Sequence, residues 1–553
     1  MNFKQGTTVN MPVTQQQHLR NSLLPGSPHQ EPAEWSAWHC RLYRGFCLLT
    51  LVVILFSHSE RVQAQNPRAL ETYQKQYQIL QADFRNKLIQ LAQDCQREQQ
   101  QTGVETITEI IKELQEFDPQ ANPLPREVRP DLPVSLPASE RSWRLKLRNL
   151  QEEQANDLFV FSRKVLHADF PSYAYDLILE TAYHNPDHRS VRQILGYVRN
   201  GDEWVTPFEK EMHDRKQQWH PQYGWLPATH IARYEQGERY VNGRWKSAAQ
   251  EAEIRRDFRN AWEIKTEHFL IKTNHSLEMG VKLATEMEDF HRYFHQTFAA
   301  FFNTPEQMQK LFEGARNPFQ RRNKNDQHVM HYYSTREEYL QRLQKDIPQI
   351  SLTHGIYLFG DRISHFYHRP DAEGDLGTLY HEATHQLFYE SSFQGRNRQV
   401  GEKNHFWAIE GIACYMESFE KQNKKLRAGN PNHIRFNAAR YRLLKDEYYI
   451  PLETFAAMGR NAFQTSPNIS PNYSQASGLS HFFMHASRGE YRDAFINQLT
   501  QLYSVNSRVR NNPQSIEELT GLSYTDLDRQ YREYSASLQK ALNERALSLQ
   551  SRP

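Results

Sequence analysis

Residues 381–385 read His-Glu-Ala-Thr-His, and this short stretch constrains the surrounding fold more than any other feature of the chain. Two histidines four residues apart project from one face of a helix, so both imidazoles can reach one metal ion. The adjacent Glu382 then lies near the open coordination position, where its carboxylate can take a proton from water. A structural zinc site uses four protein ligands and a catalytic site three, so a single further ligand is the feature to look for.

That further ligand is Glu410, in the segment Trp-Ala-Ile-Glu-Gly-Ile-Ala-Cys-Tyr-Met-Glu at 407–417, which begins a second helical pattern. We predict that His381, His385 and Glu410 bind the metal and that Glu382 is the catalytic general base. Zn²⁺ is the expected ion because two imidazoles and one carboxylate suit its borderline softness and leave a fourth position for water. The alternative is a surface helix whose two histidines share a face by chance.

The two motifs together resemble those of the gluzincin zinc metallopeptidases, whose third ligand is the glutamate of a W-x-x-E-G-type helix. More narrowly, the chain resembles bacterial secreted proteins with a peptidase MA-like domain, many of them of unassigned function. The resemblance covers roughly residue 262 to the C-terminus. It implies an α+β, mostly helical fold, in which a gluzincin-like catalytic domain has a small mixed sheet and an active-site HExxH helix. It also implies hydrolysis of a peptide or protein substrate by metal-activated water.

Tyr473 is the predicted oxyanion donor, because related gluzincins use a tyrosine at a comparable distance after the glutamate ligand. The alternative is a tyrosine that only packs. Three histidines are weaker candidates for the same role, namely His365, His481 and His485.

Support for the metal ligands is expected from Glu417. It follows Glu410 by seven residues, about two helical turns, and therefore lies on the same face. A matching acidic residue in related aminopeptidases implies that it accepts a hydrogen bond from a ligand imidazole, and the alternative is an exposed carboxylate. Glu390 is a weaker candidate.

A hairpin is predicted just before the motif, from the apolar runs at 356–359 and 363–367. The resemblance implies that an edge strand here pairs with an extended substrate, and the alternative is an ordinary structural hairpin. No Gly-x-Met-Glu-Asn segment precedes it to hold a free amino terminus, so endopeptidase action is favoured over exopeptidase action. The inserted loop at 391–405 is longer than in thermolysin-like relatives.

The N-terminus has the order of a secretory signal peptide. Arg41 and Arg44 precede an apolar run at 46–56, and small or aliphatic residues lead to a predicted cut after Ala64. We therefore expect an exported protein, in the periplasm, the cell envelope or outside the cell, with no stable membrane span after the leader is removed. An uncleaved signal anchor is the alternative, although the run is short for a hydrocarbon core of about 30 Å.

Composition narrows the class of protein and its partners further. A net charge of +2 without long runs of like charge argues against a nucleic-acid partner. The aromatic content of 12% supplies large side chains for a core. The mature chain would keep only Cys95 and Cys414, for which two separate buried thiols are favoured over one bridge. Nothing in the sequence indicates the oligomeric state.

Apolar periodicity and turn signals divide the chain into segments. Apolar residues spaced by three and four predict helices before residue 117, Asn242-Gly243 predicts a type I′ hairpin, and 268–273 and 277–302 read as a strand and a long helix. The predicted order is leader and signal peptide 1–64, helical hairpin 65–117, Pro-rich linker 118–138, helical module 139–202, small aromatic-rich β module 203–261, peptidase MA-like zinc domain 262–540 and tail 541–553. The rival interpretation is an exported, non-catalytic zinc-containing binding or cell-envelope interaction protein.

Overall fold

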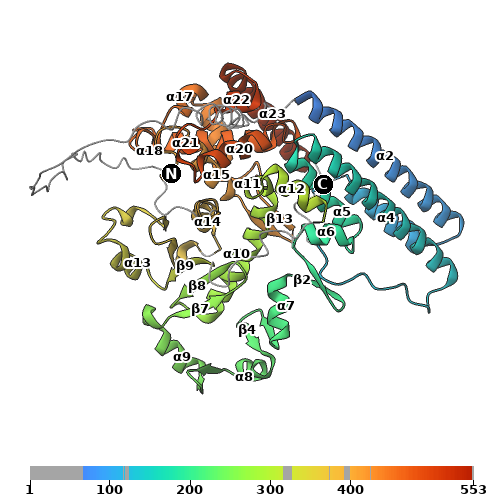
Figure 1. Ribbon diagram of the computed structural model, residues 1–553, viewed down its shortest axis with the longest axis horizontal. Helices are drawn as coiled ribbons and strands as arrows, with labels where there is room; N and C mark the ends of the chain where they lie inside the picture. Colours follow the sequence, from blue (N-terminus) through green and yellow to red (C-terminus); the bar gives the residue numbers. More distant parts are fainter. Residues whose placement is uncertain are drawn as a thin grey trace, which may run out of the picture. The chain divides into compact units, whose positions relative to one another are not determined.

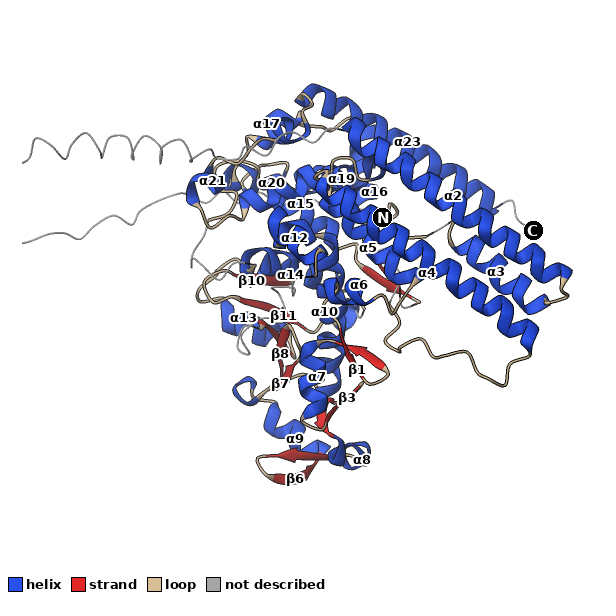
Figure 2. Cartoon of the chain, turned by 45° about the vertical axis from the view of Figure 1, so that its right-hand side comes forward, coloured by secondary structure: helices blue, strands red, loops and turns tan. Residues whose placement is uncertain are grey.

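The computed structural model describes residues 67–115, 117–118, 124–314, 327–372, 374–391, 399–423 and 425–550. The predicted leader and its cleavage site after Ala64 lie outside these residues. The described chain is mostly helical with small sheets that pair both parallel and antiparallel, so the predicted mostly helical α+β class is confirmed (Figures 1 and 2). Among the helices described, none is both long enough and apolar enough to cross a bilayer.

The first helices pack through the apolar stripes seen in the sequence. They are α2 (Pro67–Arg97), α3 (Gln101–Glu113), α4 (Ala138–His167), α5 (Pro171–His184) and α6 (Arg189–Ile194). Phe84 and Leu88 of α2 share one apolar cluster with Ile107 of α3 and Trp143 of α4. Part of the predicted linker is hydrogen-bonded to strand β2 (Glu203–Val205) of the region that follows, because the Trp204 backbone N–H donates to the Arg126 carbonyl at 2.7 Å.

Three successive β-hairpins follow, and each is followed by a short α-helix. They are β1 (Val198–Asn200), β2 (Glu203–Val205) and α7 (Pro207–Asp214); β3 (Gln217–His220), β4 (Gly224–Pro227) and α8 (Ile231–Glu235); and β5 (Glu238–Val241), β6 (Arg244–Ser247) and α9 (Ala248–Arg255). The second strand of each hairpin carries a tryptophan, namely Trp204, Trp225 and Trp245. Asn242 and Gly243 have φ angles of 49° and 79°, which confirms the predicted type I′ turn. The sequence predicted only this third hairpin, and the first one crosses the predicted boundary at 203.

A five-stranded mixed sheet packs against the helix that carries the HExxH motif. Its strands are β7 (Trp262–Lys265), β8 (Phe269–Thr273), β9 (His328–Tyr333), β10 (Gly355–Leu358) and β11 (Ile363–Tyr367), in the order β10-β11-β9-β8-β7. The three inner strands run parallel, and the edge strands β7 and β10 pair antiparallel to their neighbours. The predicted strand at 268–273 and the predicted hairpin before the motif are both present.

The remaining helices pack mostly with this sheet around one large apolar core, whereas Met308 and Leu311 belong to the cluster of the first helices and Tyr339 to a separate small cluster. These helices are α10 (Leu277–Thr297), α11 (Ala299–Phe302), α12 (Pro305–Phe312), α13 (Arg336–Leu343), α14 (Gly377–Glu390), α15 (Phe406–Met416), α16 (Ile434–Leu444), α17 (Leu452–Ala456), α18 (Arg460–Gln464), α19 (Ile469–His485), α20 (Arg492–Leu502), α21 (Ser507–Asn511), α22 (Ile516–Thr520) and α23 (Tyr524–Gln550), with a small hairpin of β12 (Glu420–Gln422) and β13 (Lys425–Arg427). The predicted helix at 277–302 is broken into α10 and α11, and α23 continues past the predicted boundary at 540. Helix α14 lies between the sheet and α15, and α15 lies between α14 and α19 (Figures 1 and 2).

Candidate metal centre

Helix α14 carries the HExxH motif and is fixed to the core by its apolar residues. Ala383 and Leu387 are almost fully buried, and the Tyr380 ring stacks on Phe290 of α10 with the centroids 4.9 Å apart. With this face buried, His381 and His385 both point toward α15. The helical periodicity that buries one set of side chains therefore aims the two imidazoles in one direction.

Helix α15 brings a carboxylate into an apolar setting. Every residue from Phe406 to Met416 is buried, and Glu410 is the only acidic one among them. A buried carboxylate is unfavourable unless cations or hydrogen-bond donors surround it. Gly411 permits the close packing of α15 on α19, because a Cβ atom there would lie 2.5 Å from both the Ala476 carbonyl oxygen and Ser480 Oγ.

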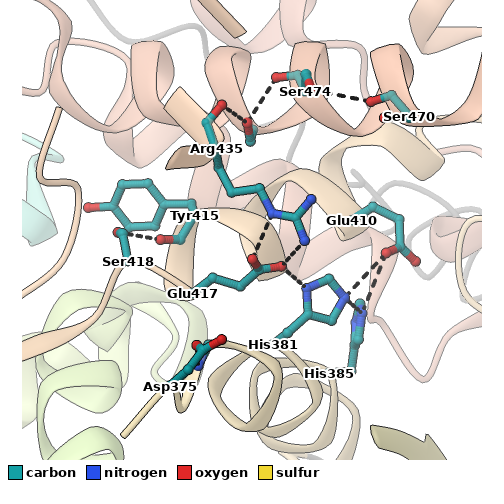
Figure 3. A network of polar contacts seen from close by, with 12 residues as sticks. Asp375, His381, His385, Glu410, Tyr415, Glu417, Ser418, Arg435, Ser470 and Ser474 are labelled. Carbon is teal, nitrogen blue, oxygen red and sulfur yellow. Dashed lines mark hydrogen bonds and ion pairs between the residues drawn. The ribbon is translucent and has the colours of Figure 1, made fainter. Parts of the chain in front are cut away.

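The three predicted ligands converge. His381 Nε2 lies 3.2 Å from His385 Nε2 and 3.5 Å from Glu410 Oε2, while His385 Nε2 lies 3.8 Å from Glu410 Oε2. Two ligands bound at zinc distances with a tetrahedral angle between them lie about 3.3 Å apart. The imidazole rings meet edge to face at 76°, and their Nε2 atoms lie next to each other. These residues are placed as ligands of one ion would be (Figure 3).

Charge at the site favours a cation. Burial alone would raise the pKa of Glu410, but its close contacts with the imidazoles of His381 and His385 outweigh burial and hold the pKa well below the usual range. Glu410 is therefore ionised at neutral pH, as a carboxylate ligand must be.

Glu382 is partly buried and is not part of the ligand cluster. Its Oε2 accepts a hydrogen bond from the backbone N–H of Tyr357 on β10, at 2.9 Å. Burial raises the pKa of Glu382, although the neighbouring His381 and His385 oppose this change. The carboxylate is thus held between the edge strand and the two histidines, which is the position that a general base needs.

Glu417 supports His381, as predicted from its spacing. Its Oε1 accepts from His381 Nδ1–H at 2.8 Å, and this bond orients the ring so that Nε2 faces the ligand cluster. Arg435 of α16 donates to both oxygens of Glu417, at 2.7 and 2.8 Å (Figure 3). Burial would raise the pKa of Glu417, but the contacts with His381 and Arg435 outweigh it and lower the pKa to about 2.

Two neighbours of this pair were not predicted from the sequence. Cys414, predicted only to be a buried thiol, lies within hydrogen-bonding reach of His381. Its place four residues after Glu410, on the same helical face, is a signal that would have found it. Arg435 had no such signal, because only the packing of α16 brings it to the site. Cys95 and Cys414 are both free and buried, so the predicted pair of separate thiols is confirmed.

Tyr473 lies near the centre, in the second turn of α19. Burial raises its pKa well above the usual range, and the carboxylate of Glu410, with which its hydroxyl hydrogen-bonds, raises the pKa further. Its ring also packs edge-on against Phe463, at 5.3 Å between centroids. The tyrosine thus both packs and presents its hydroxyl to the metal ligands, and its role as oxyanion donor stays a prediction.

The weaker sequence candidates make their contacts elsewhere. His365 hydrogen-bonds the Tyr333 hydroxyl, His481 contacts the Gly429 carbonyl and the Tyr534 hydroxyl, and His485 pairs with the Tyr415 hydroxyl. Glu390 bonds to His328 and Tyr357 and contacts neither ligand imidazole in the described part of the chain.

Two other groups of potential ligands are less suitable. His268 and His291, with Glu288, lie close together, but their rings stack with centroids 3.6 Å apart and planes at 19°. Because an imidazole lone pair lies in the ring plane, stacked rings do not direct their lone pairs at one ion. The group of His381, Cys414 and Glu417 lies beside the Arg435 guanidinium, which repels a cation.

Comparison with known proteins adds one match. A family model described as "Protein of unknown function (DUF1570)" matches residues 375–504. This stretch runs from just before α14 to just after α20, so it includes the three candidate ligands, Glu382 and Tyr473. No curated protein matches the chain.

Proposed function

We propose that the chain is an exported zinc-dependent peptidase of gluzincin-like architecture. The observation that carries the proposal is the convergence of His381 Nε2, His385 Nε2 and Glu410 Oε2, with the carboxylate of Glu382 next to them but outside the ligand cluster. Three ligands plus a neighbouring base are the donor set of a catalytic site, because a structural zinc site takes a fourth protein ligand. Zinc bound there would act as a Lewis acid on water and on the scissile carbonyl.

The other roles in catalysis belong to side chains of the protein. Glu382 accepts the proton of the attacking water and returns it to the leaving amine. Tyr473 donates its hydroxyl proton in a hydrogen bond to the developing oxyanion, a role that its pKa, raised by burial, keeps available at neutral pH. Glu417 and Arg435 hold the His381 ring in its tautomer and orientation.

An extended peptide is the substrate that suits the sheet. Strand β10 is an edge strand beside α14, and Leu358 uses its carbonyl to pair with Arg362 across the hairpin. Because successive residues of a strand face opposite sides, Gly355 and Tyr357 direct their backbone groups to the open edge. The Tyr357 N–H is bonded there to Glu382, so a peptide would pair with the other backbone groups of this edge. Main-chain pairing there would give recognition with little side-chain selectivity, in keeping with endopeptidase action.

The test is metal analysis combined with a broad peptide-cleavage screen on protein beginning at Gln65. One zinc per chain and cleavage that a chelator abolishes are expected. His385→Ala should lose both, while His167→Ala, which alters an exposed histidine at the end of α4, should keep both. Full zinc retention by His385→Ala would overturn the ligand assignment. Zinc without any cleavage would favour the rival non-catalytic binding protein, which has no need for Glu382.

A further inference from the structure

Tyr357 contacts the HExxH helix at two points. Its backbone N–H donates to Glu382 Oε2 at 2.9 Å, and its side-chain hydroxyl donates to Glu390 Oε1, also at 2.9 Å. Glu390 is the last residue of α14, eight residues and just over two turns after Glu382. Tyr357 of the edge strand is therefore hydrogen-bonded both to the predicted base and to the last residue of the helix that carries it.

Glu390 is a rigid anchor for this arrangement. It is 2% exposed and accepts from His328 Nδ1 at 2.7 Å, from Gln386 at 3.1 Å and from Arg362 at 3.3 Å, besides the Tyr357 hydroxyl. These donors come from β9, α14, the turn of the β10–β11 hairpin and β10. A buried carboxylate with four donors is held in one orientation, because each lost donor would leave it less well satisfied.

We propose that Tyr357 and Glu390 are positioning residues for the general base: their hydrogen bond holds β10 against α14 and so keeps the Tyr357 N–H on Glu382. The kinetic consequence rests on the proposed peptidase function, whereas the contact between strand and helix does not. The strand restrains one carboxylate oxygen of Glu382, and the other oxygen is the one that would take up the proton of water. Loosening the strand frees the carboxylate of Glu382 to rotate away from the orientation that proton transfer needs.

Hydrogen–deuterium exchange tests the contact without any substrate. Tyr357→Phe keeps the ring and the backbone N–H but removes the hydroxyl, and Glu390→Gln keeps the shape but removes the charge. In either variant we expect the amides of residues 355–358 to exchange about tenfold faster or more, the effect of losing a hydrogen bond to a charged group. The matched control is Tyr77→Phe, which removes a hydroxyl that donates at 2.9 Å to the buried Glu180, a contact between α2 and α5.

Kinetics test the positioning claim. In both variants kcat should fall about tenfold with KM nearly unchanged and zinc content intact, while Tyr77→Phe should keep the wild-type kcat. Glu390→Gln decides the matter if Tyr357→Phe does not fold. Unchanged exchange in the folded variants would show that the Tyr357–Glu390 hydrogen bond does not hold β10 against α14. Faster exchange with an unchanged kcat would show that the bond is a structural contact that does not position the base. If the wild-type protein cleaves no peptide, the proposed function fails, yet the exchange data still decide whether Tyr357 and Glu390 hold the strand against the helix.

Discussion

Replacing Glu417 should weaken zinc binding without unfolding the protein. The Glu417 carboxylate holds His381 through a 2.8 Å hydrogen bond, whereas His385 Nδ1 has no hydrogen-bond partner among the residues described. Of the two histidine ligands, His381 is therefore the one whose ring is oriented by a hydrogen bond. Removing such a partner lowers metal affinity about 10–100-fold, equivalent to about 1.4–2.7 kcal/mol.

The effect on folding should be smaller. Arg435, the other partner of Glu417, has 38% of its side chain exposed and regains water when the carboxylate is lost. An ion pair of this kind contributes about 1 kcal/mol or less. We expect Glu417→Gln, which keeps a neutral acceptor, to lose about tenfold in zinc affinity, and Glu417→Ala to approach 100-fold. The metal-free Tm should change by only a few degrees in either variant.

The assay is competition for zinc against a chelator of known affinity at fixed pH, with Glu420→Gln as control. Glu420 lies three residues further along, in β12, and contacts Asn430 but no candidate ligand. The reasoning fails if both Glu417 variants bind zinc as tightly as the wild-type protein. It also fails if Glu420→Gln weakens binding to the same extent.

Three further predictions concern packing, export and the thiols. Gly411→Ala should lower the free energy of unfolding by about 1–3 kcal/mol in chemical denaturation, because its new methyl group would collide with the Ala476 carbonyl; unchanged stability would mean that α15 and α19 are not packed so closely. Sequencing of the exported protein should begin at Gln65, and an intact leader in the membrane fraction would support a signal anchor instead. Cys95 and Cys414 should both react with a thiol reagent after unfolding without reductant, and a count of zero would indicate a bridge.

Much of the local structure follows from sequence patterns. The stripe of apolar residues in α2, the Asn242-Gly243 turn and the strand β8 were predicted because each depends on neighbours in the chain. The break between α10 and α11, within one continuous apolar pattern, was not predicted, because the pattern persists across it. The hairpin β1–β2 was missed although Asn200-Gly201 stands at its turn, because each of its strands is only three residues long. The hairpin β3–β4 was missed because its turn lacks the Asn-Gly signal.

The candidate site divides in the same way. His381, His385 and Glu417 were found because helical spacing fixes the faces on which they lie. Arg435 and Tyr357 reach the site from α16 and β10, through contacts that no sequence spacing encodes. The interpretation of Glu390 was the least accurate, since it ties the helix to the sheet and does not support a ligand imidazole.

The central claim is that Glu382 is a catalytic base beside a zinc ion, and Glu382→Gln tests it most directly. The amide keeps the size of the side chain and can still accept from the Tyr357 N–H, so fold and zinc content should survive. General acid–base catalysis contributes about 10²–10⁴ in rate, so cleavage of a peptide substrate should fall by at least about 100-fold. A variant that keeps one zinc and cleaves the same peptide at a near wild-type rate would show that Glu382 is not the base and would contradict the mechanism proposed.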